Sequence, residues 1–158
     1  MNINQLISIV KNKIEKNISL EYVNIEDKTF LHKSHKTHQN GLSVDFMVPI
    51  VNASGESVHL PTHQFNRFGY DIEFDKDGRL DEWRIDYEAM AAHIVALHKA
   101  SVNRGYNLWR VIYAPELQPH LYKTQYAAYL AKHIQFSKKR SWVRHDEHYH
   151  VDFAIPCK

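Results

Sequence analysis

The sequence has few of the residues that staple or anchor a small protein. Its single cysteine, Cys157, permits no disulfide within the chain, so the fold must be stable in any redox compartment. No segment approaches the roughly 18 apolar residues that a membrane helix requires, so we expect no membrane insertion. The first residues show no basic stretch followed by an apolar run, and no secretory signal is therefore visible.

An excess of charge of one sign is also lacking. The 20 Lys and Arg residues nearly balance the 18 Asp and Glu residues, giving a formal net charge of +2 and a sequence pI of about 8.6. So mild a balance gives no reason to expect nucleic acid as a partner. Histidine, by contrast, is abundant: the 12 histidines would add positive charge below about pH 6.5.

Length and composition predict one globular domain. A chain of 158 residues, 44% of them hydrophobic, can bury a core without disulfides. No internal repeat, low-complexity stretch or linker divides it, so residues 1–158 should form a single domain. Residues 1–25 would be an N-terminal helical extension, with an amphipathic helix over 4–16, and residues 30–158 would be the core.

Helices and strands are predicted in mixed order. Apolar spacing predicts helices over 86–103 and 116–134, with Asp86 as the N-cap of the first. No β–α–β rhythm is present, so we predict the α+β class: a small, mainly antiparallel central sheet flanked by helices and long loops. Pro49 should mark an edge or a bend. The expected strands cover 19–24, 44–51, 108–113 and 149–155.

The segment 52–81 is predicted to be irregular. Turn signals stand at 52–56 and at 75–78, and the second could form the tip of a hairpin. A loop of this length is often functional, for example as the wall of a substrate groove. The alternative is a pair of small strands.

Two histidine-rich segments, far apart in the sequence, contain the residue types of a zinc site. The first runs from His35 to Asp45, and the second, from His145 to His150, holds three histidines. A catalytic zinc ion usually has three protein ligands and an open fourth position. His38, Asp45 and His150 would supply these ligands.

The spacing of the second segment suits a strand. His148 and His150 would project to the same side, about 7 Å apart, so that one binds the metal while the other reaches a water or the substrate. Such a pair alone is more often a surface feature, but its combination with His38 and Asp45 favours a metal site. The other histidines are expected at the surface or in helix packing: His32, His59, His63, His93, His98, His120 and His133.

These two segments resemble the penicillin-insensitive murein endopeptidases, part of the wider lysostaphin and D-Ala-D-Ala metallopeptidase group. The family pattern His-X-X-His-Gln-X-Gly-Leu-X-Val-Asp matches His35 to Asp45 at each specified position. The later pattern His-X-X-His-X-His-Val matches His145 to Val151. A looser likeness over residues 110–117 lies between them, and the resemblance covers roughly residues 30–158.

The resemblance implies a role for each residue. His38, Asp45 and His150 would bind Zn²⁺, His148 would act as general base, and His145 would stabilise the oxyanion, although the last two roles could be reversed. His35 is a candidate additional site residue, because it aligns with a histidine of a second metal position in some relatives. Residues 30–158 would then be the catalytic core of a zinc metallopeptidase.

The implied reaction is hydrolysis of the amide bond between D-alanine and diaminopimelate in peptidoglycan, with the peptide cross-links as partner. A D,D- or L,D-carboxypeptidase of the same zinc chemistry and a non-catalytic wall-binding domain are alternatives. Family members are usually exported and contain several cysteines. The expected place of action is therefore the periplasmic cell wall, reached by phage lysis or dedicated secretion, unless the sequence is a trimmed part of a longer one.

Overall fold

The computed structural model describes residues 41–62, 65–66, 69–141 and 143–155. Within these ranges the chain forms two small antiparallel sheets and three helices, which confirms the predicted α+β class. No helix in the described ranges is long and apolar enough to cross a membrane. The predicted helix over 4–16, the predicted strand over 19–24, and the candidate site residues His35 and His38 lie outside the described residues.

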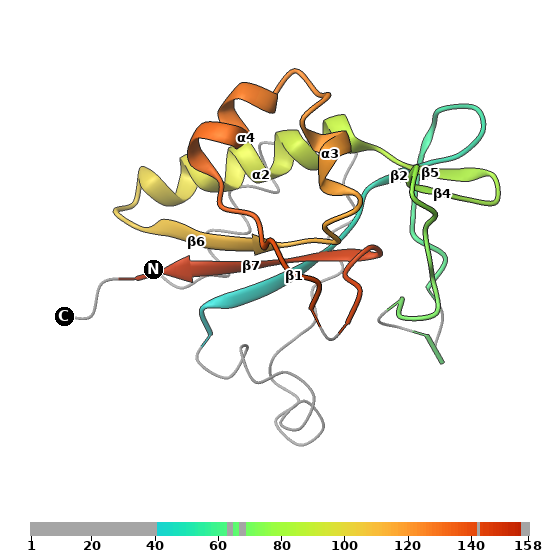
Figure 1. Cartoon of the computed structure of the whole chain (residues 1–158), viewed down its shortest axis with the longest axis horizontal. Helices are drawn as coiled ribbons and strands as arrows, with labels where there is room; N and C mark the ends of the chain where they lie inside the picture. Colours follow the sequence, from blue (N-terminus) through green and yellow to red (C-terminus); the bar gives the residue numbers. More distant parts are fainter. Residues whose placement is uncertain (1–40, 63–64, 67–68, 142, 156–158) are drawn as a thin grey trace.

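A three-stranded sheet brings the two motif segments together. Its strands are β1 (Ser43–Met47), β7 (His148–Ala154) and β6 (Asn107–Ile112), in the order β1-β7-β6, and both pairs are antiparallel. β7 is the middle strand of this sheet (Figure 1). β1, which contains Asp45 at the end of the first motif, therefore lies directly beside β7, which contains His148 and His150 of the second motif.

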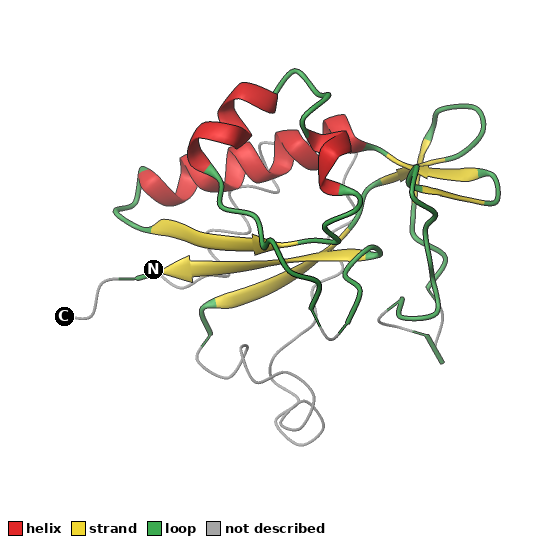
Figure 2. Ribbon diagram, in the orientation of Figure 1, coloured by secondary structure: helices red, strands yellow, loops and turns green. Residues whose placement is uncertain are grey.

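The two faces of this sheet differ in chemistry. Side chains alternate along a strand, so one face of the sheet is apolar and the other carries the polar residues of β1 and β7. The apolar row, which includes Phe46, Tyr149 and Val151, is buried in the core, and the helices cover one side of the sheet (Figure 2). The ring of Phe46 packs edge-on against His93 of the long helix, with centroids 4.7 Å apart.

That long helix, α2 (Tyr87–Val102), agrees with the prediction over 86–103. The side chain of Asp86 accepts a hydrogen bond from Ala89 N at 3.0 Å, so it caps the helix as expected. The predicted apolar face is also confirmed, because its members have no exposed surface: Met90, Ile94, Leu97 and Ser101.

The prediction of one continuous helix over 116–134 is wrong. The structure has two shorter helices, α3 (Gln118–Leu121) and α4 (Ala127–His133), with a turn between them. Thr124 lies in this turn, and its hydroxyl donates to Leu121 O at 2.7 Å. Such local side-chain bonds to the backbone compete with helical hydrogen bonding, which explains the interruption.

The predicted strand over 44–51 divides between two sheets. β1 ends at Met47, and β2 (Ile50–Val51) joins the second sheet after the bend expected at Pro49. The second sheet has the order β3-β2-β5-β4. Its other strands are β3 (Ser57–Val58), β4 (Arg79–Leu80) and β5 (Trp83–Ile85). Segment 52–81 therefore contains two small strands, and the strands form two sheets rather than one central sheet.

Candidate functional site

Asp45 and His150 contact each other across the β1–β7 pair. They are register partners, and His150 Nδ1 lies 2.7 Å from Asp45 Oδ1, although the residues are 105 positions apart in the sequence. His150 is 3% exposed. The structure thus brings together two of the three residues predicted to bind zinc.

The other ring nitrogen of His150 is held by a second carboxylate. His150 Nε2 lies 2.8 Å from Asp152 Oδ1, two residues along the same strand face. Burial by itself would lower the pKa of His150, but the hydrogen bonds and negative charges of Asp152 and Asp45 outweigh it and raise that pKa to about 9. The metal-free imidazole is therefore a cation between two carboxylates near neutral pH.

Glu147 holds the ring of His148. His148 Nδ1 lies 2.8 Å from Glu147 Oε1, and both side chains are buried. Burial alone would raise the pKa of Glu147, but the hydrogen bond and charge of His148 bring it below its ordinary value. With Nδ1 engaged by an ionised carboxylate, Nε2 is the nitrogen of His148 that can exchange a proton with a substrate or a water.

His145 completes a cluster of three imidazoles. Its ring centroid lies 4.5 Å from that of His148 and 6.4 Å from that of His150. Its Nδ1 donates to Val143 O at 2.8 Å, and its backbone has a positive φ of 56°. Burial, followed by the neighbouring His148, lowers the pKa of His145, so this ring is neutral near pH 7.

Part of segment 52–81 borders this cluster. The ring of Tyr70 lies 6.1 Å from that of His148, measured between centroids. Burial, together with the negative charges of Asp45 and Glu147, raises the pKa of Tyr70 to about 12. Its hydroxyl therefore stays protonated near neutral pH.

Asp45 and His150 supply two donor atoms of the kind that a divalent ion takes. Metal-binding histidines usually donate their second ring N–H to a carboxylate, which fixes the ring, and here Asp152 accepts from His150 Nε2. The opposite nitrogen faces the Asp45 carboxylate, so both atoms could turn toward one ion. Among the residues that are described, no group of three or more His, Cys, Asp or Glu side chains is arranged to hold a metal. The predicted third ligand, His38, lies outside them.

Three contributors were not predicted as site residues: Glu147, Asp152 and Tyr70. Asp152 could have been found, since strand alternation places it on the same face as His150. Glu147 adjoins His148 in sequence, but adjacent residues of a strand point to opposite faces. The contact of Glu147 with the His148 ring therefore depends on the bend just before β7 begins. Tyr70 carried no signal, because a loop's path toward the site cannot be read from periodicity.

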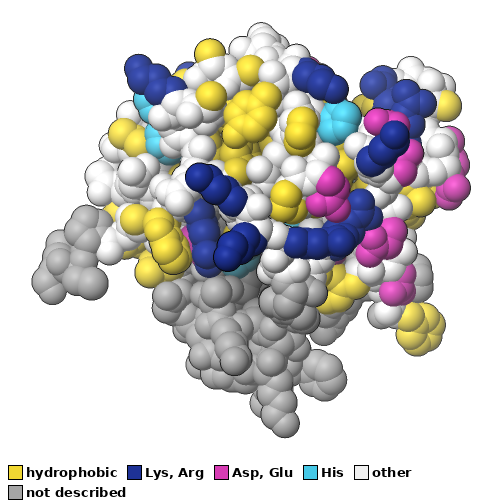
Figure 3. Space-filling view, viewed as in Figure 1, with side chains coloured by type: hydrophobic (Ala, Val, Ile, Leu, Met, Phe, Trp, Pro, Cys, Tyr) yellow, Lys and Arg dark blue, Asp and Glu magenta, His cyan; other side chains and the backbone are white. Residues whose placement is uncertain are grey.

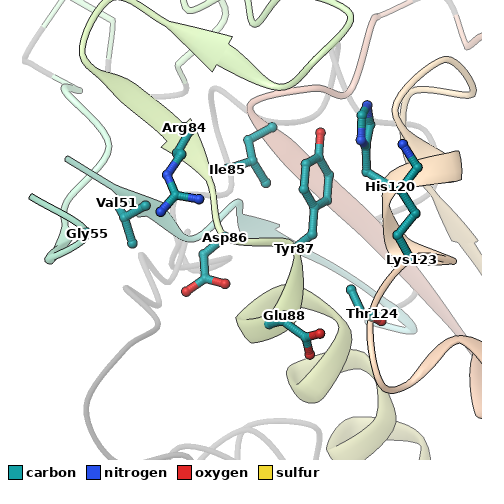
Figure 4. A pocket seen from close by; sticks show the side chains of 10 residues that line it. All are labelled: Val51, Gly55, Arg84, Ile85, Asp86, Tyr87, Glu88, His120, Lys123 and Thr124. Carbon is teal, nitrogen blue, oxygen red and sulfur yellow. The ribbon is translucent and has the colours of Figure 1, made fainter. Parts of the chain in front are cut away.

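A cavity of about 360 Å³ lies apart from this cluster. It is bordered by β2, β5, the start of α2 and α3, and its lining includes Arg84, Tyr87, His120 and Lys123 (Figure 4). None of the predicted site residues lines it. On the face drawn in Figure 3, acidic and basic side chains intermingle over the β4–β5 hairpin, while other basic groups are spread across the described surface.

Comparison with protein-family models gave no match, and searches of curated proteins and of solved structures likewise gave none. The geometry of the histidine cluster and the two sequence motifs are therefore the basis for a functional proposal.

Proposed function

We propose that this protein is a zinc-dependent endopeptidase that hydrolyses D-alanyl–diaminopimelate cross-links in peptidoglycan. One observation carries the proposal: Asp45 and His150, drawn from two distant motifs, are in direct contact at 2.7 Å, with the rings of His145 and His148 beside them. The bond and the substrate class come from the motif resemblance.

The ligands would be His38, Asp45 and His150. A zinc ion held there would act as a Lewis acid on the scissile carbonyl. It would also lower the pKa of a water, so that hydroxide is available to attack near neutral pH. Asp152 would keep the His150 ring in place through its Nε2 contact. To bind the ion, His150 must lose the Nδ1 proton that it donates to Asp45 in the metal-free protein, and it keeps the Nε2 proton that it donates to Asp152.

His148 is the better general base of the two remaining histidines. Its Nε2 would take the proton of the attacking water, and the Glu147 carboxylate, 2.8 Å from Nδ1, would stabilise the resulting imidazolium. The same ring would then return the proton to the leaving amine. The Nδ1 of His145 contacts a backbone carbonyl rather than a carboxylate, so the protonated form of His145 would be stabilised less than that of His148.

The stabilisation of the developing oxyanion, assigned by resemblance to His145, needs a hydrogen-bond donor. At neutral pH His145 uses its one N–H on Val143 O and presents an acceptor at Nε2. The ring of Tyr70 lies 6.1 Å from that of His148, measured between centroids, and its hydroxyl keeps its proton at neutral pH. We therefore assign the donor role to Tyr70 at neutral pH, and to His145 only when it is protonated.

Digestion of isolated sacculi tests the proposal. Zinc-loaded protein, with and without chelator, should convert dimeric muropeptides into monomers, as measured by mass analysis of the fragments. Release of free alanine instead would identify a carboxypeptidase, and bound metal without any turnover would identify a wall-binding domain.

Variants assign the roles in the same assay. Asp45→Ala and His150→Ala should abolish cleavage and weaken zinc binding, whereas His148→Ala should keep the metal and lose about 10²- to 10⁴-fold in rate. His133→Ala is the matched control, because His133 is an exposed histidine on α4. Full activity of metal-depleted His150→Ala protein would contradict the proposal.

A further inference from the structure

A β-bulge lies in β6 beside the candidate site. Leu108 pairs with Phe153, but the next pair along the strand is Arg110 with Asp152, so Trp109 is an extra residue without a partner on β7. A bulge adds one residue to one strand and thereby changes which side chains share a face.

This bulge turns Arg110 toward the histidines. Residues two apart on a regular strand point to the same side, so Arg110 would otherwise lie on the face of Leu108. Leu108 is buried with the core, whereas Arg110 contacts Asp152 on the polar face. Trp109 is 56% exposed, and the Arg110 guanidinium lies 4.5 Å from its ring centroid, a cation–π contact that supports the new orientation.

Arg110 belongs to a chain of contacts that ends on His150. Arg110 Nε donates to Asp152 Oδ2 at 2.6 Å, and Ser43 Oγ donates to Asp152 Oδ1 at 2.6 Å. The same Oδ1 lies 2.8 Å from His150 Nε2. Both oxygens of Asp152 are therefore fixed from the neighbouring strands, β1 and β6.

We propose that Arg110 is a positioning residue for His150: by fixing the Asp152 carboxylate, it orients the imidazole so that Nδ1 faces Asp45 and a bound divalent ion. The inference rests on the metal site of the proposed function, but not on the bond that is cleaved. Without Arg110, the Asp152 carboxylate loses the contact that fixes Oδ2 and can rotate away from His150. Partners of this kind typically change metal affinity by about 10- to 100-fold.

Zinc affinity of the full chain, measured by competition with a chromophoric chelator, tests the inference. Arg110→Gln should weaken zinc binding by about 10- to 100-fold, and Arg110→Lys, which keeps the charge, should recover part of that loss. Arg104→Gln is the matched control, because Arg104 donates a single hydrogen bond to Ala100 O, on α2. It should bind zinc as the unaltered protein does.

Two further readouts separate positioning from a structural effect. Zinc-free Arg110→Gln should still unfold in one cooperative transition, at a lower temperature because the buried Asp152 loses a cation, and its cleavage rate should recover at saturating zinc with its KM unchanged. If Arg110→Gln fails to fold, Ser43→Ala loosens the same carboxylate from the opposite strand and should weaken zinc binding several-fold.

The outcomes distinguish this inference from the proposed function. Zinc binding by Arg110→Gln at the unaltered affinity, or the absence of zinc binding by the unaltered protein, would overturn the inference. A protein that binds zinc, loses affinity in Arg110→Gln and cleaves no sacculi would overturn the proposed endopeptidase activity and leave the role of Arg110 supported.

Discussion

Replacing His93 by asparagine should make the stability of the fold less sensitive to acid. His93 lies on α2 and is 1% exposed. Its Nδ1 is hydrogen-bonded to the Tyr149 hydroxyl, and its ring packs edge-on against Phe46. Burial lowers the pKa of His93 from 6.5 to about 4, because the charged imidazolium cannot be solvated in this part of the core.

The sign and size of the effect follow from this shift. The folded pKa lies below the unfolded one, so between pH 6.5 and pH 4 the unfolded chain binds a proton that the folded chain does not. The contribution of neutral His93 to stability is therefore complete above pH 6.5 and declines as pH falls. At about 1.4 kcal/mol per pH unit, a shift from 6.5 to about 4 amounts to about 3 kcal/mol.

Urea unfolding followed by tryptophan fluorescence at pH 7, 5.5 and 4 measures this loss. His93→Asn keeps a polar group near Nδ1 but cannot titrate, so its free energy of unfolding should fall by about 3 kcal/mol less than that of the unaltered protein over this range. Tyr149→Phe is the control, because it removes the partner and keeps the titrating ring. A constant difference between His93→Asn and the unaltered protein from pH 7 to pH 4 would refute the reasoning.

Three other predictions concern the turn at Gly78, the helix cap and the metal. Gly78→Ala should destabilise the fold by about 1–3 kcal/mol more than Gly55→Ala. Both glycines have positive φ, but only at Gly78 would a Cβ lie 2.2 Å from the Tyr87 hydroxyl. Equal losses of unfolding free energy in urea would contradict this prediction. Asp86→Ala should cost about 1 kcal/mol by loss of the bond to Ala89 N, and an unchanged unfolding midpoint would exclude the cap. Zinc at about 1,000 times its dissociation constant should add about 4 kcal/mol to the free energy of unfolding relative to chelator-treated protein, and identical melting curves would argue against a native-state site.

Local patterns were enough to predict the elements around the site. The alternation of β7 predicted that His148 and His150 share a face, and the same rule places Asp152 with them, in agreement with its contact to His150. The cap and the apolar stripe of α2 were likewise readable, because helix period and capping chemistry act within a few residues. The break at Thr124 was missed, since it depends on a single hydroxyl that prefers a local backbone bond.

Contacts between distant segments were harder to predict. The spacing of the motifs indicated that Asp45 and His150 converge, but not that they would be register partners on adjacent strands. The role of Arg110 depends on the bulge at Trp109, which changes the face of one residue without leaving a pattern in composition or periodicity. The approach of Tyr70 depends on the path of a loop. The predictions for His35 and His38 stay predictions.

Anomalous X-ray scattering at the zinc edge, from crystals of the zinc-loaded protein, tests the central claim most directly. The account predicts one strong peak at about 2.0–2.2 Å from both His150 Nδ1 and a carboxylate oxygen of Asp45, with their mutual hydrogen bond replaced by the metal. A peak elsewhere, or none while Asp45 and His150 keep their contact, would contradict it.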